Sequence, residues 1–283
     1  MILIADCGST KIDWCLLNGN EKVAQIFTTG MNALLLTQEE MTQRIHDELM
    51  HHLMSYDLTN LEIYYYGAGI INDEIKSHVV NALKANIPSA GLIEVASDLL
   101  AAARALCGHK PGIACIMGTG SNSCYYDGER VVENVSPLGY ILGDEGSGAV
   151  LGKRLMGDIL KKQLPGYLCE TFLKEYDLNR DKIINAVYRQ PAANRFLAQF
   201  APFLKKHISD EAVHKLVCSS FVDFFVRNVA SYAGYKDLPC NFVGSIAFEF
   251  ADVLREAAAT QGITVGTIIK NPMEGLIKYH SAN

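Results

Sequence analysis

The sequence lacks the features that mark membrane proteins and nucleic-acid-binding proteins. Its 283 residues contain no apolar run of about 18 residues, the length that a membrane-spanning helix needs. The N-terminus has no basic segment and meets Asp6 at once, so we expect no signal peptide. The formal net charge is -6 and there is no basic tract, which gives nucleic-acid binding no support. We therefore expect a cytoplasmic protein with an ordinary charged surface.

The cysteines lack the clustering that a metal site requires. There are eight of them, no two are closer than eight residues, and no CxxC pair occurs. Zinc and iron–sulfur sites need clustered thiolates, which this spacing does not supply locally. Several cysteines lie in apolar, strand-like runs, so we predict buried thiols in a reducing compartment.

The length suits two domains, although no Pro/Ser-rich linker separates them. Apolar runs and turn residues predict strand, glycine turn, strand, Gly-containing hairpin and strand at the start of the chain, followed by alternating helices and strands. The same order restarts about 110 residues later, at Gly112. The second copy then becomes mostly helical down to Tyr235. The pattern indicates an α/β chain with two halves of similar organisation.

Three glycine-rich stretches dominate the sequence, and two of them are turns that follow a strand. The first is Asp6-Cys7-Gly8-Ser9-Thr10-Lys11 and the second is Gly118-Thr119-Gly120-Ser121-Asn122. Glycine lets the backbone approach a phosphate, and amide and hydroxyl groups donate hydrogen bonds to it. The second turn is neither a Walker loop nor a GxGxxG fingerprint, because no GK[ST] and no third glycine follow. Plain hairpin turns remain the alternative for both.

Two aspartates that could do chemistry lie in the first half. Asp6 could hold Mg²⁺ through water, because Mg²⁺ keeps several waters and takes few carboxylates. Asp98 follows a strand and begins a helix, where a carboxylate could take a proton from a substrate hydroxyl. The alternative for Asp98 is an N-cap, which the position also suits.

The third glycine-rich stretch, Gly143 to Gly148, carries two acids ahead of a helix. Asp144 could accept two hydrogen bonds from neighbouring sugar hydroxyls, while acids that favour the helix dipole are the alternative. Farther on, Gly244-Ser245 stands between a strand and a helix, where an adenine ring could lie against bare backbone. An ordinary strand-to-helix turn is an equally good explanation there.

Taken together, these stretches resemble the sugar kinase/actin/Hsp70 superfamily, and within it the BadF/BadG/BcrA/BcrD ATPase family and its N-acetylglucosamine kinase branch. GTGSN followed some twenty residues later by GDEGSG is the most specific signal. The resemblance implies two ribonuclease-H-like (actin-like ATPase) domains with an ATP cleft between them. We expect 1–108 plus 271–283 to form one domain and 109–270, with a helical insertion, to form the other.

The resemblance also implies roles for single residues. ATP is expected at the two turns and the adenosine-side turn, through Gly8, Ser9, Thr10, Lys11, Gly118, Thr119, Gly120, Gly244 and Ser245. Mg²⁺ is expected at Asp6, and Asp98 is implied to be the general base. The sugar is expected at Asn32, Ser121, Asn122, Gly139 and Asp144. Pro137 departs from the glycine-rich pattern that the family has before GDEGSG.

The function expected from these residues is ATP-dependent phosphorylation of an amino sugar, first of all N-acetylglucosamine. The partner would be a small-molecule sugar, with no nucleic acid and no membrane, and a homodimer is compatible with the sequence. The alternative is a BadF-type ATPase that activates a partner protein. Those activators carry a GGQD-type stretch, which this sequence lacks. The ROK sugar kinases carry a compact cysteine cluster, which is also absent.

Overall fold

The computed structural model describes residues 1–8 and 11–281. The chain divides into two compact units, the first formed by Met1–His109 with the segment from Pro272, the second by Lys110–Asn271. Each unit is built on a five-stranded mixed sheet. The structure confirms the predicted α/β class.

The two sheets have the same strand order. The first sheet runs β3-β2-β1-β4-β5 and the second runs β8-β7-β6-β9-β10. In each, the first three strands form an antiparallel meander. The fourth strand pairs in parallel with the central strand, and the fifth pairs in parallel with the fourth. The strands are β1 (Ile2–Cys7), β2 (Lys11–Asn18), β3 (Glu21–Thr29), β4 (Glu62–Gly67), β5 (Leu92–Ser97), β6 (Gly112–Met117), β7 (Ser121–Tyr126), β8 (Val131–Glu133), β9 (Cys240–Val243) and β10 (Val265–Ile269).

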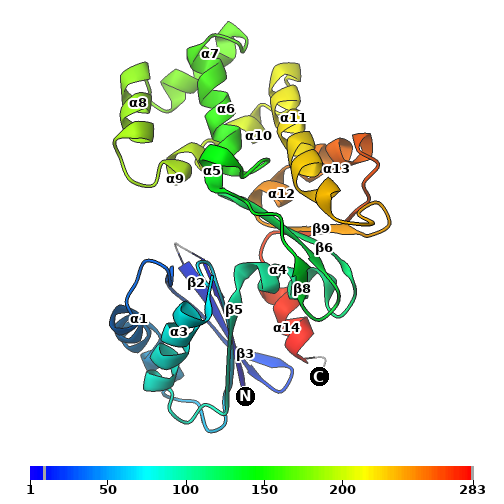
Figure 1. Ribbon diagram of the computed structural model, residues 1–283. Coiled ribbons are helices and arrows are strands. Elements are labelled where there is room, and N and C mark those ends of the chain that lie inside the picture. Colours follow the sequence, from blue (N-terminus) through cyan, green and yellow to red (C-terminus); the bar gives the residue numbers. More distant parts are fainter. Residues whose placement is uncertain (9–10, 282–283) are drawn as a thin grey trace. The chain divides into compact units, whose positions relative to one another are not determined.

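The first sheet is covered on both faces (Figure 1). One face packs against the region of α1 (Gln38–Ile45), a π-helical turn (His46–Met50), α2 (His51–Leu53) and α3 (Asp73–Asn86). The other face packs against α4 (Asp98–Cys107) and the last helix, α14 (Met273–Ser281). The chain therefore returns to the first unit after it has built the second.

The first helical region shows how sequence spacing sets local structure. Met41, Ile45, Leu49 and Leu53 are all buried, as their spacing of four residues predicts. Such spacing drifts around a helix of 3.6 residues per turn, and the wider π-helical turn keeps the stripe on one face. A threonine followed three residues later by a glutamate predicts a capping box, and Thr37 and Glu40 form one at the start of α1.

In the second unit, one face of the sheet shares a large core with the helices that follow it. These helices are α5 (Gly139–Leu142), α6 (Gly148–Leu160), α7 (Gly166–Glu175), α8 (Arg180–Tyr188), α9 (Ala193–Ala198), α10 (Ala201–Lys206), α11 (Glu211–Arg227), a 3-10 turn (Val229–Ser231), α12 (Ser245–Glu249) and α13 (Ala251–Thr260). The aromatic residues of α11, Phe221, Phe224 and Phe225, lie in this core. No helix in the described part of the chain combines the length and the hydropathy of a membrane span.

Two strands of the second unit differ from those that the letters predict, which are 123–126 and 130–135. β7 begins at Ser121 instead of Ser123, so part of the second glycine stretch is already strand. β8 ends at Glu133 instead of Val135. Beyond Glu133 side chains replace the strand ladder: Asn134 Nδ2 donates to the Ser123 carbonyl at 2.6 Å, and Val135 N donates to the Tyr232 hydroxyl at 3.1 Å.

Most of the cysteines are buried, as predicted: six of the eight have almost no exposed surface, and the other two are partly buried. Cys115 and Cys240 lie on neighbouring strands with their sulfur atoms 3.6 Å apart. This separation is well beyond the roughly 2.05 Å of a disulfide bond.

Candidate active site

The aspartates of the first unit lie where parallel strands end. β1, β4 and β5 run parallel, so their carboxyl ends meet at one edge of the sheet. Asp6 is the penultimate residue of β1, and Asp98 follows β5 directly. Asp13 on β2 stands opposite Asp6 in the antiparallel pair, which places these two carboxylates on the same face.

Burial and neighbouring negative charge together perturb Asp6. The Asp6 pKa is raised to about 7, first by loss of water around its carboxylate and then by the charges of Asp13 and Asp98, against a lowering by Lys11. Gln25 Nε2 donates to both oxygens of Asp13, at 3.0 and 3.1 Å, and orients that carboxylate. The site therefore favours a proton, or another cation, close to Asp6.

Asp98 is the first residue of α4 and is not its cap. The cap is Ser97, whose side-chain oxygen accepts from Leu100 N at 3.3 Å. The N-cap alternative for Asp98 is therefore wrong, since the residue before it already does that work. Desolvation raises the pKa of the Asp98 carboxyl, and the amides of Leu99 and of Asp98 itself lower it in part.

The first glycine turn closes through its backbone. Gly8 N donates to the Lys11 carbonyl at 3.0 Å. The Lys11 ammonium lies 5.2 Å from the centre of the Phe27 ring, a cation–π contact. Ser9 and Thr10, both predicted to bind ATP, lie outside the described residues.

Asn32 is held in a tight turn beyond β3. Its Oδ1 accepts from Leu34 N at 3.0 Å. A Cβ at Gly69, just after β4, would lie 2.3 Å from that oxygen, and Gly69 has φ of +84°. Only glycine fits there, so Gly69 belongs to the surroundings of Asn32. No local pattern in the sequence marks Gly69, because its partner Asn32 lies in a distant turn.

In the second unit, four glycines meet at the end of β6. Gly118 N donates to the Gly120 carbonyl at 2.9 Å, and Gly148 N, at the start of α6, donates to the Gly118 carbonyl at 2.8 Å. A Cβ at Gly244 would lie 2.3 Å from the Met117 carbonyl oxygen and 3.2 Å from Gly118 N. The structure thus brings together the second glycine turn, the start of α6 and the Gly244 turn.

The remaining ATP candidates lie at the same place. Thr119 is exposed, and its carbonyl accepts from Ala149 N at 3.0 Å. Ser245 is exposed as well and begins α12. Exposed turns around bare glycine backbone offer amide groups to an anion and a flat surface to a ring.

Asp144 lies against the second glycine turn. Its backbone has φ of +55°, and its carbonyl accepts from Ser147 N at 3.1 Å. One carboxylate oxygen lies 3.4 Å from Ser121 N, and the other would lie 3.1 Å from a Cβ at Gly120. Desolvation raises the pKa of the Asp144 carboxyl.

Ser121 and Glu145 hold the loop that carries Asp144. The buried Ser121 hydroxyl donates to the Glu145 carbonyl at 2.8 Å. The Glu145 carboxylate pairs with Arg227 Nε at 2.6 Å and accepts from Asn228 Nδ2 at 3.3 Å. These partners from the end of α11 were missed by the sequence analysis, because they are about 80 residues away and carry no motif.

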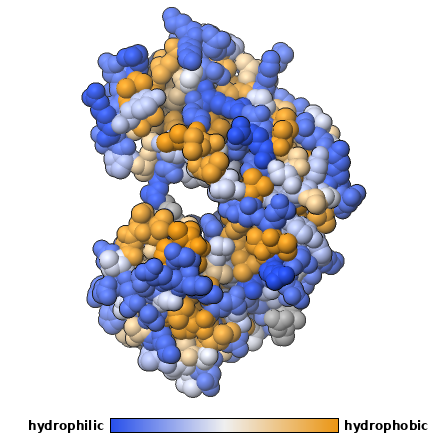
Figure 2. Space-filling model, in the orientation of Figure 1, coloured by the Kyte–Doolittle hydropathy of each residue, from blue (hydrophilic) through white to orange (hydrophobic). Residues whose placement is uncertain are grey.

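The segment before this loop is exposed. Leu138, Ile141 and Leu142 keep 59%, 72% and 69% of their surfaces in solvent. Gly139 is exposed too, has φ of +73°, and accepts from Gly143 N at 2.7 Å through its carbonyl. Hydrophobic residues do reach the visible surface among the charged ones (Figure 2).

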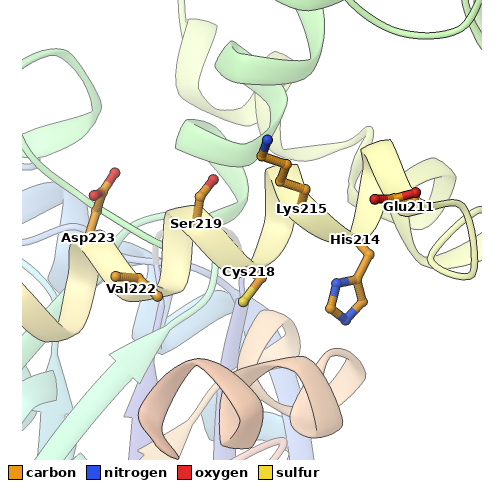
Figure 3. Close-up of a pocket in the computed structure, with 7 residues that line it drawn as sticks. All are labelled: Glu211, His214, Lys215, Cys218, Ser219, Val222 and Asp223. Carbon is orange, nitrogen blue, oxygen red and sulfur yellow. The ribbon is translucent and has the colours of Figure 1, made fainter. Parts of the chain in front are cut away.

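A separate hollow lies on α11 and contains none of the predicted site residues. Its volume is about 480 Å³. Figure 3 shows seven lining side chains, all of them from this one helix. They are Glu211, His214, Lys215, Cys218, Ser219, Val222 and Asp223. Two of them already have partners: Asp223 forms an ion pair with Arg154, and His214 Nε2 lies 3.0 Å from a carboxylate oxygen of Glu256.

No family model and no curated protein matches the chain. Solved structures do. A proposed N-acetylglucosamine kinase from Porphyromonas gingivalis has 47% sequence identity and a TM-score of 0.95, over 100% of this chain and 99% of that one. A proposed N-acetylglucosamine kinase from Chromobacterium violaceum has 18% identity and a TM-score of 0.78, over 98% of both chains. A ROK-family glucokinase from Streptomyces griseus, in complex with glucose and AMPPNP, has 14% identity and a TM-score of 0.54, over 98% and 97%. The likeness to the last two proteins, at 18% and 14% identity, shows the fold alone.

The two sheets of identical order, together with these likenesses, define the actin-like two-domain fold of the sugar kinases. At 47% identity over nearly the full length of both chains, the chain belongs to the same family as the Porphyromonas gingivalis protein.

Proposed function

We propose that the chain catalyses the ATP-dependent phosphorylation of an amino sugar, first of all N-acetylglucosamine. The family relationship supports the substrate class. The observation that carries the chemistry is Asp98, a desolvated carboxylate at a strand end whose helix is capped by another residue. Asp98 is therefore available for proton transfer.

In the proposed reaction, a sugar hydroxyl oxygen attacks the γ-phosphorus of ATP. The bond between that phosphorus and the oxygen of the β-phosphate breaks, and ADP leaves with the bonding electrons. The hydroxyl proton passes to the carboxylate of Asp98. A raised pKa suits this role, because a stronger base takes the proton more readily near neutral pH.

We assign the phosphates of ATP to the glycine turns at Gly8–Lys11 and Gly118–Gly120, and adenosine to Gly244 and Ser245. The bare backbone around Gly118 and Gly244 supports this assignment. Asp6 would hold Mg²⁺, which screens the charge of the phosphates when bound. Burial and the neighbouring carboxylates both raise the Asp6 pKa, and a cation bound there would offset that charge.

We assign the sugar to Asn32, Ser121, Asn122, Gly139 and Asp144. Asn32 is fixed in its turn by the hydrogen bond from Leu34 N, and the loop of Asp144 is held by the Glu145–Arg227 ion pair. Both observations support pre-organised contacts to the sugar. The Ser121 hydroxyl already donates to the Glu145 carbonyl, so toward a ligand it offers only an acceptor.

The finer placement is also proposed. Within the fold, we place the chain in the BadF/BadG/BcrA/BcrD family, with the two compact units as its two domains. Buried cysteines fit a reducing compartment such as the cytoplasm. The competing function, an ATPase that activates a partner protein, has no separate observation in its favour.

A coupled ADP-release assay tests the proposal across N-acetylglucosamine, N-acetylmannosamine, glucosamine and glucose. We expect ADP release to require a sugar and to be fastest with an N-acetylated one. ATP turnover that is independent of every sugar would instead support the activator. A brown colour of the purified protein, which indicates an iron–sulfur cluster, would do so too.

A further inference from the structure

The side chain of Asn122 has a fixed orientation. Its Oδ1 accepts from Ser123 N at 2.9 Å and from Asn134 Nδ2 at 2.8 Å. A backbone N–H can only donate, so the atom that faces Ser123 N must be the oxygen. The usual ambiguity between the oxygen and the nitrogen of an amide does not arise here.

Asn134 is fixed by the same logic. Its Nδ2 lies 2.6 Å from the Ser123 carbonyl oxygen and 3.1 Å from the Val135 carbonyl oxygen. Carbonyls only accept, so the group that faces them must be the NH₂. Asn134 therefore always presents a donor to Asn122.

These contacts leave Asn122 with only one kind of free group. Two hydrogen bonds use both lone pairs of its Oδ1. Its Nδ2 donates to no group in the parts of the chain that the structure describes, and the side chain is partly exposed. Asn122 thus offers two N–H donors to a ligand and no acceptor.

Resting on the proposed function, in which Asn122 contacts the sugar, we propose that Asn134 is a positioning residue that locks Asn122 as a donor. The sugar atom at Asn122 is then an uncharged oxygen acceptor, either a hydroxyl or the carbonyl of the acyl group. Tyr232 supports the arrangement from the far side, since its hydroxyl bridges Ser123 Oγ at 2.7 Å and Val135 N at 3.1 Å.

The test replaces Asn134 by Ala, which removes one of the two hydrogen bonds that hold the Asn122 amide and leaves one lone pair of its Oδ1 free. Sugar affinity is measured by calorimetry without ATP, beside the KM values of sugar and ATP, kcat and the melting temperature. We expect sugar binding to weaken about fivefold and the sugar KM to rise equally, with kcat and the ATP KM changed less than about twofold. Asn122→Asp, which has no donor, should weaken the sugar more. Asn185→Ala, an exposed asparagine on α8, is the control.

Two sugars distinguish the two acceptors. If Asn134→Ala weakens N-acetylglucosamine but not glucosamine, the acceptor is the acyl carbonyl. If it weakens both equally, the acceptor is a hydroxyl. Sugar affinity within twofold of wild type would overturn the inference, as would an equal loss for ATP.

Calorimetry also separates this inference from the proposed function. Sugar binding that depends on Asn134 without any phosphate transfer would defeat only the kinase proposal. A wild-type protein that binds no sugar would defeat both.

Discussion

At the residue scale, the chemistry of the first unit depends on which carboxylates are used by the fold and which are not. Ser97 caps α4 and leaves the Asp98 carboxylate outside the capping interaction. Gln25 donates a hydrogen bond to Asp13. Asp6 is buried beside Asp13 and Asp98, and its pKa is raised. A residue type and its position in a motif therefore do not define its role until its neighbours are known.

Asp98→Asn tests the general base. Turnover should fall by about 10²–10⁴-fold, because the amide cannot accept the hydroxyl proton. The melting temperature and ATP binding should hold, since Ser97 still caps the helix. Steady-state kinetics measures turnover, thermal unfolding gives the melting temperature, and a calorimetric titration gives the affinity for ATP. Asp73→Asn is a matched control, because Asp73 is the first residue of α3 and that helix is capped by Asn72.

Wild-type turnover with a lowered melting temperature would show Asp98 to be structural, and the base would then be sought first at Asp144.

In the wild type, the raised Asp98 pKa should place the acid limb of the pH–rate profile above the roughly 4 of an ordinary aspartate, because the base must be ionised.

Asp6→Asn tests whether the raised pKa of Asp6 makes the stability of the protein depend on pH. The Asp6 pKa is raised to about 7 in the folded chain, so the folded state holds the proton more tightly than the unfolded state. The stability from this proton is fully present below the unfolded pKa of roughly 4 and is lost as the pH rises toward 7. The asparagine variant should lose this dependence and gain stability at pH 8 relative to wild type.

Denaturant unfolding from pH 4 to 8 measures this effect. Asp237→Asn, an exposed loop aspartate, serves as the control and should leave the wild-type slope in place. An unchanged slope in Asp6→Asn would show that Asp6 is not the group that responds to pH.

At the element scale, α14 is held close to α4. Gly275 allows the approach, since a Cβ there would lie 2.4 Å from the carbonyl oxygen of Ala105 and 2.8 Å from its Cα. Polar contacts complete the docking: the His280 ring lies 2.8 Å from the Tyr66 hydroxyl, which also accepts from Arg104 at 2.7 Å. The same α4 begins with Asp98, so the last helix supports the helix that carries the proposed base.

Two helical glycines should respond in opposite directions to alanine. Gly275→Ala should lower the free energy of unfolding by about 1–3 kcal/mol, because backbone atoms must move to admit the methyl group. Gly157→Ala, in α6, meets nothing within 4 Å and should raise it by roughly 0.5–1 kcal/mol through helix propensity. Denaturant titrations give the free energy of unfolding of both variants. If both changed it in the same direction, the close packing of α14 would be refuted.

At the scale of the whole molecule, each unit has its own hydrophobic core. Leu276 of α14 is fully buried in the first unit, and Leu254 of α13 is fully buried in the second. The second unit is continuous in sequence, whereas the first is assembled from both ends of the chain. The stability of the first unit therefore depends on a segment that follows the second unit in the chain.

Leu276→Ala and Leu254→Ala should act on different units. Each should cost about 2–5 kcal/mol, the loss of a buried side chain plus the cavity left behind. Hydrogen exchange followed by mass spectrometry should show faster exchange in residues 1–109 for the first variant and in residues 110–271 for the second. Faster exchange across the whole chain in either variant would mean that the two units unfold together.

The sequence by itself determined what depends on near neighbours. Glycine turns between strands, the capping box at Thr37 and the buried stripe from Met41 to Leu53 involve residues a few positions apart, so their pattern is visible in the letters. The repeated order of strands predicted the α/β fold in the same way. The roles of the site residues were predicted by resemblance and stay predictions.

Only the tertiary structure decided which group each polar atom meets. Ser97 rather than Asp98 caps α4, and Arg227 pairs with Glu145. Asn134 donates to Asn122. Beyond the end of β8, the Tyr232 hydroxyl accepts the hydrogen bond of Val135 N in place of a strand partner. Except for the cap, these partners are about 10 to 100 residues apart in the chain, beyond the range of any local pattern. A hydrogen bond or an ion pair requires two atoms about 3 Å apart, and only the packing of distant segments brings such pairs together.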